Sequence, residues 1–210
     1  MKLLSLLALF FAALMGAARE VNVPIISGGT VYELSKSGGV EMKLTGSTPF
    51  SHWTLTAHRL SAQSEMDVSS DRRIRSIEAL SFTLPVHNLK GNNSGMEQDA
   101  YDALKAARYP NIVFRMASAN IQSRGDHQFV QAIGTLSIAG VTKPIMLQMD
   151  VATSDDGSVT FHGSQEMKMS DYGVTRPTIL GIFKAGDAMA LDYQLTFVKT
   201  SNFTNEGNTR

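Results

Sequence analysis

Apolar and polar residues alternate with a period of two along most of the chain. Leu80, Phe82 and Leu84 fall on one face of their segment, and Ser81 and Thr83 fall on the other. The same alternation recurs in segments 40–46, 52–58, 112–116, 130–138, 145–151, 159–168 and 189–197. Strands with one apolar face are typical of an antiparallel sheet with one solvated side. The pattern predicts an all-β fold.

One segment, residues 96–107, departs from this period and predicts a helix that ends before Pro110. Its apolar stripe consists of Met96, Ala100, Ala103, Leu104 and Ala107. About eight strands of the predicted kind can close into a barrel, which removes exposed sheet edges. We therefore expect a single antiparallel eight-stranded barrel with one flanking helix. Asp155, Asp156 and Gly157 predict a hairpin turn between two of its strands.

The N-terminus has the layout of a secretory signal peptide. Lys2 precedes an apolar run over residues 3–15, which ends in small residues up to Ala18. That run is shorter than the roughly 20 residues of a membrane-spanning helix, so no spanning segment is expected. We predict a signal peptide over residues 1–18, a barrel domain over 19–198 and a polar tail over 199–210. The mature protein is then periplasmic, or secreted from a cell with one membrane.

Composition narrows the functional classes. Lys+Arg and Asp+Glu are equal at 19 each and the sequence pI is about 7.0, which disfavours nucleic acid as a partner. The chain has no cysteine, so neither disulfides nor thiol chemistry contribute.

The sequence contains none of the familiar catalytic or metal-binding motifs. The sequence holds no nucleophile elbow, Walker loop or zinc-protease helix. None of the five histidines lies within four residues of another, so no local chelate and no metal site are expected. An enzyme would need polar groups inside the apolar lumen, whereas His52, His58 and His162 fall on the polar strand faces. We expect no catalysis.

The pattern leaves the state of the barrel interior open. Small barrels are either filled by their own side chains or hold one ligand. Abundant methionine suits a lining that adapts to an irregular lipid, although methionine is also a common core filler.

Several short motifs are similar to those of a known family and occur in the same order along the chain. They are Gly46–Thr48 with His52–Thr54, Met96 through Lys105, Tyr109–Phe114, Gly134–Pro144, Asp171–Val174 and Gly186–Asp187. Over residues 22–198 the chain resembles the YceI-like, polyisoprenoid-binding family. The runs Tyr109–Phe114 and Leu136–Pro144 are the most specific of these motifs.

The resemblance implies a lipocalin-like eight-stranded barrel with a helix, exported to the periplasm. It further implies that the interior holds a polyprenyl chain or an isoprenoid quinone, with no other cofactor, for carriage or sequestration. The alternative is a non-catalytic structural or interaction barrel with a filled core. A homodimer is possible. The charged segment 66–77 matches no family motif; we expect a solvated loop there, or arginines that face a lipid head group or a partner.

The candidate ligand-binding positions are apolar strand residues that we expect to point into the barrel. They are Trp53, Leu55, Leu80, Phe82, Ile112, Phe114, Met116, Leu136, Leu147, Met149, Phe161, Leu191, Tyr193 and Phe197. The loop over residues 170–184 is expected at the cavity mouth, because loops at a barrel rim carry recognition. Its candidate residues are Tyr172, Arg176 and Ile182.

Overall fold

The structure is a computed structural model that describes residues 29–37, 39–179 and 183–200. Its strands are β1 (Thr30–Leu34), β2 (Val40–Ser47), β3 (His52–Ala57), β4 (Ser61–Val68), β5 (Ile74–Pro85), β6 (Asn111–Arg124), β7 (His127–Ile138), β8 (Val141–Thr153), β9 (Val159–Lys168), β10 (Thr178–Ile179), β11 (Phe183–Lys184) and β12 (Ala188–Lys199). The helical elements are η1 (Val86–Asn88), α1 (Ser94–Ala103) and η2 (Met169–Tyr172).

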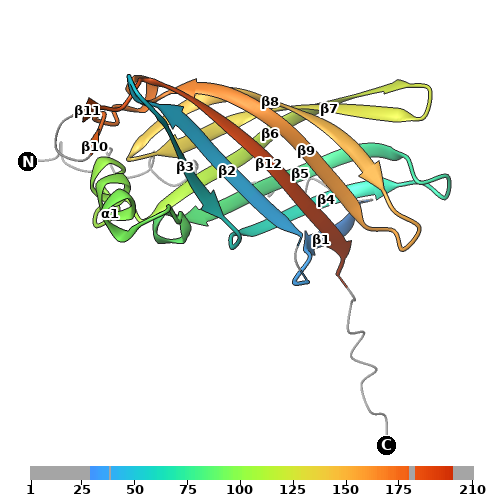
Figure 1. Ribbon diagram of the computed structural model, residues 1–210. Helices are drawn as coiled ribbons and strands as arrows, with labels where there is room; N and C mark the ends of the chain where they lie inside the picture. Colours follow the sequence, from blue (N-terminus) through green and yellow to red (C-terminus); the bar gives the residue numbers. More distant parts are fainter. Residues whose placement is uncertain (1–28, 38, 180–182, 201–210) are drawn as a thin grey trace, which may run out of the picture.

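The sheet closes into an antiparallel barrel, as the sequence predicts. Its strands follow the order β1-β4-β5-β6-β7-β8-β9-β12, and β12 pairs with β1 to complete a ring of eight (Figure 1). β2 continues the line of β1 along β12, and β3 pairs with β2. The predicted fold class is therefore confirmed.

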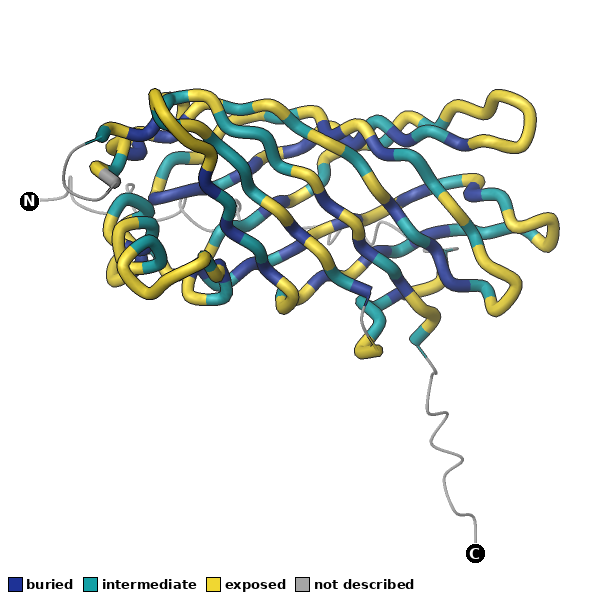
Figure 2. The backbone as a smooth tube through the Cα atoms, in the orientation of Figure 1, coloured by how far each residue is buried: buried dark blue, intermediate teal, exposed yellow. Residues whose placement is uncertain are grey.

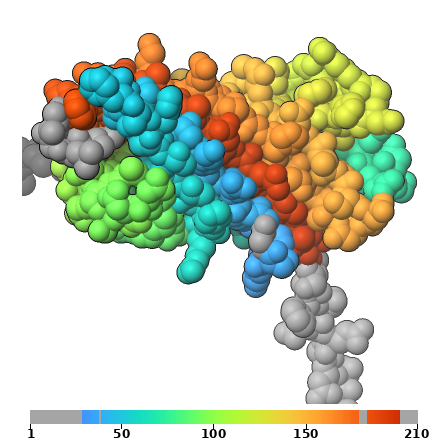
Figure 3. Space-filling model, in the orientation of Figure 1, coloured from blue at the N-terminus to red at the C-terminus, as the bar shows by residue number. Residues whose placement is uncertain are grey.

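One end of the barrel differs from the other. α1 and the short β10–β11 hairpin lie at the first end, which we call the mouth end, whereas the β4–β5, β6–β7 and β8–β9 hairpins project from the far end (Figure 1). Buried and exposed residues alternate along the strands, so that the apolar phase faces inward (Figure 2). The side wall formed by β2, β12 and β9 is continuous in the space-filling view (Figure 3).

The helix is shorter than predicted. Asn93 caps its N-terminus, where its side-chain oxygen accepts a hydrogen bond from the Met96 amide at 2.9 Å. It ends at Ala103, because Lys105 takes a left-handed conformation with φ of 54° and turns the chain away. The predicted end of the stripe at Ala107 is consequently wrong: Ala107 is exposed, and Ala106 is buried in its place.

The charged segment 66–77 is not a loop, which corrects the sequence-based expectation. β4 runs through Val68 and β5 begins at Ile74, so only residues 69–73 form a turn. Its arginines bind neighbouring hairpins: Arg72 pairs with Asp155, and Arg73 donates to the Gly125 carbonyl at 2.8 Å. These two arginines thus join the far-end hairpins to one another.

A bulge in β6 changes the inward phase midway along the strand. The register with β7 shifts between Met116 and Ser118, so the inward positions switch from even to odd numbers. Gly134 lies opposite the bulge, where a β-carbon would approach the Arg115 carbonyl oxygen to 2.3 Å. Only glycine permits this close approach of two backbones.

Two seams of the barrel are paired over only part of their length, and a buried side chain bridges each. β5 pairs with β6 only from Ser81 to Pro85, and β8 pairs with β9 only from Asp150 to Thr153. At the first seam the Gln128 amide exchanges two hydrogen bonds with the Ile74 backbone, of 2.9 and 3.0 Å. At the second the Tyr193 hydroxyl donates to the Gln148 carbonyl at 3.0 Å.

The predicted domain limits are only partly visible. The expected signal peptide, residues 1–18, lies outside the described residues, as do Ile182 and residues 201–210 of the expected tail. The last strand extends through Lys199.

Candidate functional site

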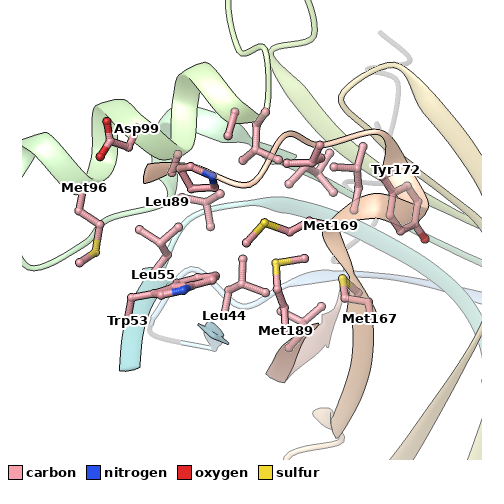
Figure 4. Close-up of a pocket in the computed structure, with 18 of the residues that line it drawn as sticks. Leu44, Trp53, Leu55, Leu89, Met96, Asp99, Met167, Met169, Tyr172 and Met189 are labelled. Atoms are coloured by element: carbon pink, nitrogen blue, oxygen red, sulfur yellow. The ribbon is translucent and has the colours of Figure 1, made fainter. Parts of the chain in front are cut away.

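A cavity of about 420 Å³ opens at the mouth end of the barrel (Figure 4). Its volume lies within the range of about 300–1,000 Å³ that is typical of small-molecule sites. We call it the mouth cavity. Its lining is Met42, Leu44, Trp53, Leu55, Phe82, Leu84, Leu89, Asn93, Gly95, Met96, Asp99, Ala100, Ala103, Leu104, Ile112, Leu136, Ile138, Met167, Met169, Tyr172, Val174, Pro177, Thr178, Met189 and Leu191.

The middle of the barrel, by contrast, is filled. The space left there measures only about 20 Å³, room for about one water molecule, and polar atoms do not line it. Phe82 stacks on Phe114 with ring centroids 5.5 Å apart, and Phe161 meets Phe197 edge to face at 5.7 Å. We call these four side chains the aromatic plug. The interior is thus hollow at the mouth end and solid below it.

The predicted ligand-binding residues divide between these two regions. Those at the mouth cavity are Trp53, Leu55, Phe82, Ile112, Leu136 and Leu191. Those around the filled middle are Leu80, Phe114, Leu147, Met149, Phe161, Tyr193 and Phe197, while Phe82, Leu136 and Leu191 touch both. Met116 packs against the core without lining either space.

Sequence reasoning missed much of the cavity wall. Met96, Ala100 and Ala103 of α1, with Leu104 just after it, form one side of the cavity. The thioethers of Met167, Met169 and Met189 gather across from Trp53 (Figure 4). The helical stripe was visible in the sequence as an amphipathic face. What that face covers depends on where the helix docks, which no local pattern specifies.

A hydrogen-bond network fixes α1 over the mouth. The Tyr101 hydroxyl donates to the Leu89 carbonyl at 2.8 Å and accepts from Lys90 Nζ at 2.9 Å. Lys90 also pairs with Glu97 at 3.0 Å, and the Gly91 amide donates to the same carboxylate at 3.3 Å. The hydrogen bond from Lys90 lowers the pKa of Glu97, and the hydrogen bond to Tyr101 raises the pKa of Lys90.

The remaining rim is built by residues 169–179 and 183–187, which lie between β9 and β12. Asp187 accepts two hydrogen bonds from Ser170, from its amide at 2.9 Å and its hydroxyl at 2.7 Å, and this contact lowers the pKa of Asp187. Gly173, with φ of 60°, closes η2. Of the residues expected at the mouth, Tyr172 is buried in the cavity wall and burial raises its pKa, whereas Arg176 is exposed.

The polar groups of the mouth cavity are few and, apart from the buried Trp53 indole and Tyr172 hydroxyl, lie at its opening. In the lining given above, Asp99 is the one charged residue, and it is exposed together with Asn93 and Thr178. The deeper wall is aliphatic, aromatic or thioether. Such a surface gains free energy by excluding water from an apolar molecule, at roughly 25 cal/mol per Å² of buried area.

Histidine and carboxylate groups do not converge in the part of the chain that the structure describes. No cluster of three or more His, Asp or Glu residues that could hold a metal ion occurs there. His162 lies 3.6 Å from Asp150 on the outer surface. Within the same described ranges, no helix is both long and apolar enough to cross a membrane.

Comparison with solved structures finds the same fold in three bacterial proteins. A polyisoprenoid-binding domain from Saccharophagus degradans implicated in plant cell wall breakdown superposes with a TM-score of 0.63 at 13% identity, over 82% of this chain and 99% of that one. Burkholderia cenocepacia BcnA gives 0.61 at 16% identity, over 75% and 95%. The Campylobacter jejuni YCEI protein gives 0.50 at 21%, over 67% and 82%.

Curated protein sequences yield no match to this chain. A family profile does match: that of the YceI-like domain, over residues 31–197. This range includes every strand of the barrel from the second residue of β1 almost to the end of β12. The motifs at Tyr109–Phe114 and Gly134–Pro144 meet in the structure, where the Tyr109 ring lies against Gly140. The chain therefore belongs to the YceI-like family.

Proposed function

We propose that this protein binds an isoprenoid lipid in the mouth cavity and carries or sequesters it without chemical change. The observation that carries the proposal is the cavity itself, an apolar pocket of about 420 Å³ inside a barrel of the YceI-like family. The similarity to a polyisoprenoid-binding domain supports the choice of lipid class. A barrel whose only role is structural would have no need of this unfilled volume.

The rim suggests a ligand with a neutral head group, such as a prenyl alcohol or a quinone. A phosphate would bring its negative charge to an opening whose one charged lining residue is the Asp99 carboxyl. Like charges at close range repel, and the cost is greater beside an apolar wall than in water. The amide of Asn93 and the hydroxyl of Thr178 can instead bond to an alcohol or carbonyl oxygen.

The chain's single tryptophan provides the assay. Trp53 lines the mouth cavity, so its fluorescence should change when a prenyl alcohol or short-chain quinone enters. We expect saturable binding by the wild type and a loss of at least about tenfold in affinity for Leu44→Glu, which places a charge in the cavity wall. Thr45→Glu, the next residue of β2 and outside that wall, is the matched control. Equal binding by both variants would contradict the proposed site.

We extend the proposal to export, on the basis of the signal-like residues 1–18. Cell fractionation and N-terminal sequencing of the mature protein should find it outside the cytoplasm, cleaved near Ala18. Extraction of protein purified from its native host should release an isoprenoid detectable by mass spectrometry. An uncleaved cytoplasmic protein would refute this extension but leave the binding proposal standing.

A further inference from the structure

We infer that the barrel takes up only the terminal segment of an isoprenoid, and that the aromatic plug sets the depth of insertion. This inference rests on the proposed function and specifies the length of chain that the protein recognises. Its basis is the contrast between about 420 Å³ at the mouth end and about 20 Å³ in the middle of the same barrel.

The boundary between the two spaces is sharp. Met42, Phe82, Leu136 and Leu191 line both of them and therefore form the floor of the mouth cavity. Below this floor Phe114 and Phe197 are 0% exposed and Phe161 is 1% exposed. Close-packed aromatic rings of this kind have no unoccupied volume to move into, so a ligand cannot displace them without opening the barrel.

The adaptable part of the interior lies above the floor. Met96, Met167, Met169 and Met189 line the mouth cavity and do not line the filled middle. Unbranched thioether side chains change shape at little cost, so they can follow the methyl branches of an isoprenoid. The protein thus combines a wall that adjusts to the width of the ligand with a floor that fixes its length.

The volume gives an estimate of that length. If each non-hydrogen atom of a packed chain needs about 25–30 Å³, close to the share of one water molecule in the liquid, the cavity holds about 15 such atoms, or roughly three isoprene units. The remainder of a longer chain stays outside the barrel. It cannot add to the apolar area that the cavity removes from water.

A length series tests the inference directly. Geraniol, farnesol, geranylgeraniol and solanesol are alcohols of increasing isoprene number, and their binding can be followed by Trp53 fluorescence in detergent at a fixed concentration. We expect affinity to rise by at least about tenfold per added unit up to roughly three or four units, because each unit buries more apolar surface. It should then stay level through solanesol. An affinity that keeps rising by the same factor would overturn the depth limit.

A plug variant provides the second arm. Phe114→Ala should move the plateau to longer alcohols, because it opens space below the floor. Ile77→Ala, a buried truncation that borders neither space, should leave the plateau in place. Phe114→Leu is a milder substitute if Phe114→Ala does not fold. An unmoved plateau in a folded plug variant would contradict the role of the plug. Absence of binding by any alcohol would overturn the proposed function as well, whereas unlimited length dependence would overturn this inference alone.

Discussion

Gln128 shows how a single buried polar side chain can complete a sheet. It lies on β7 and is 7% exposed, yet its amide bonds to both the N–H and the C=O of Ile74 on β5. Because β5 and β6 have separated by this point, those two backbone groups have no partner strand. A buried backbone group without a partner costs about 1–3 kcal/mol. The Gln128 side chain therefore supplies the two hydrogen bonds that a neighbouring strand would otherwise make with Ile74.

Replacement of Gln128 by methionine should destabilise the protein. Methionine has nearly the same shape but cannot bond to Ile74, so we expect a loss of about 2–4 kcal/mol in the free energy of unfolding. Urea denaturation followed by circular dichroism measures it. Gln122→Met, on an exposed position of β6, is the control and should change little. Similar stability of the two variants would show that Ile74 finds another partner.

At the scale of elements, hydrogen bonds and an ion pair hold α1 over the apolar mouth cavity. Its apolar stripe makes one wall of the mouth cavity, so the helix has no solid core beneath that face. Tyr101, Lys90 and Glu97 compensate by fixing the helix to the segment after η1. The helix was predictable from its period, but its end at Ala103 was not, because the left-handed turn at Lys105 has no glycine to announce it.

The anchoring of α1 should weaken in acid. The pKa of Glu97 is lower in the folded protein than its ordinary value of 4.5, so its stabilising contribution is fully present above 4.5. It is lost as the pH falls through the lowered folded-state pKa. The pKa of Lys90 is raised in the folded protein above its ordinary value of 10.5. Its stabilising contribution is therefore fully present below pH 10.5 and is lost in alkali, as the pH rises through the raised folded-state pKa.

Hydrogen exchange of the α1 amides measures this effect. We expect protection of α1 in the wild type to exceed that in Glu97→Gln at pH 7, and the difference to shrink well below pH 4.5. Asp102→Asn, on the same helix, is the matched control, because the Asp102 carboxyl accepts a hydrogen bond from the Gln98 side chain and does not join the network around Tyr101. A difference between wild type and Glu97→Gln that persists at low pH would rule out ionisation of Glu97 as the cause.

At the scale of the whole molecule, the barrel has two parts with different tasks. The far half is a packed core whose hairpins are joined by Arg72 and Arg73, and it supplies stability. The mouth half is hollow and carries the proposed function. A charge should therefore have different consequences in the two parts, although both belong to the same inward phase of the strands.

Phe161→Asp should prevent stable folding rather than remove a ligand from a folded protein. Phe161 is 1% exposed and packs edge to face on Phe197, so the substitution both opens a cavity and buries a carboxyl group. Thermal denaturation should show a loss of several kcal/mol or no cooperative transition at all. Leu44→Glu, in the half-buried wall of the mouth cavity, should retain a cooperative transition. A folded Phe161→Asp variant that merely lost ligand would show that Phe161 belongs to the binding site.

The sequence by itself predicted the barrel, because a period of two places the inward residues of each regular stretch of strand on one face, regardless of which strands become neighbours. It also indicated the helix and, through the motifs at Tyr109 and Gly140, the family. The tertiary structure alone decided that Met116 and Ala119 share an inward side across a bulge, that residues 66–77 form two strand ends and a short turn, and that α1 covers a cavity. It also decided which inward residues fill the middle of the barrel and which surround the mouth cavity. Ile112 and Phe114 occupy equivalent inward positions along β6. Nevertheless, Ile112 lines the mouth cavity and Phe114 helps to fill the middle of the barrel, a difference that the strand pattern does not contain.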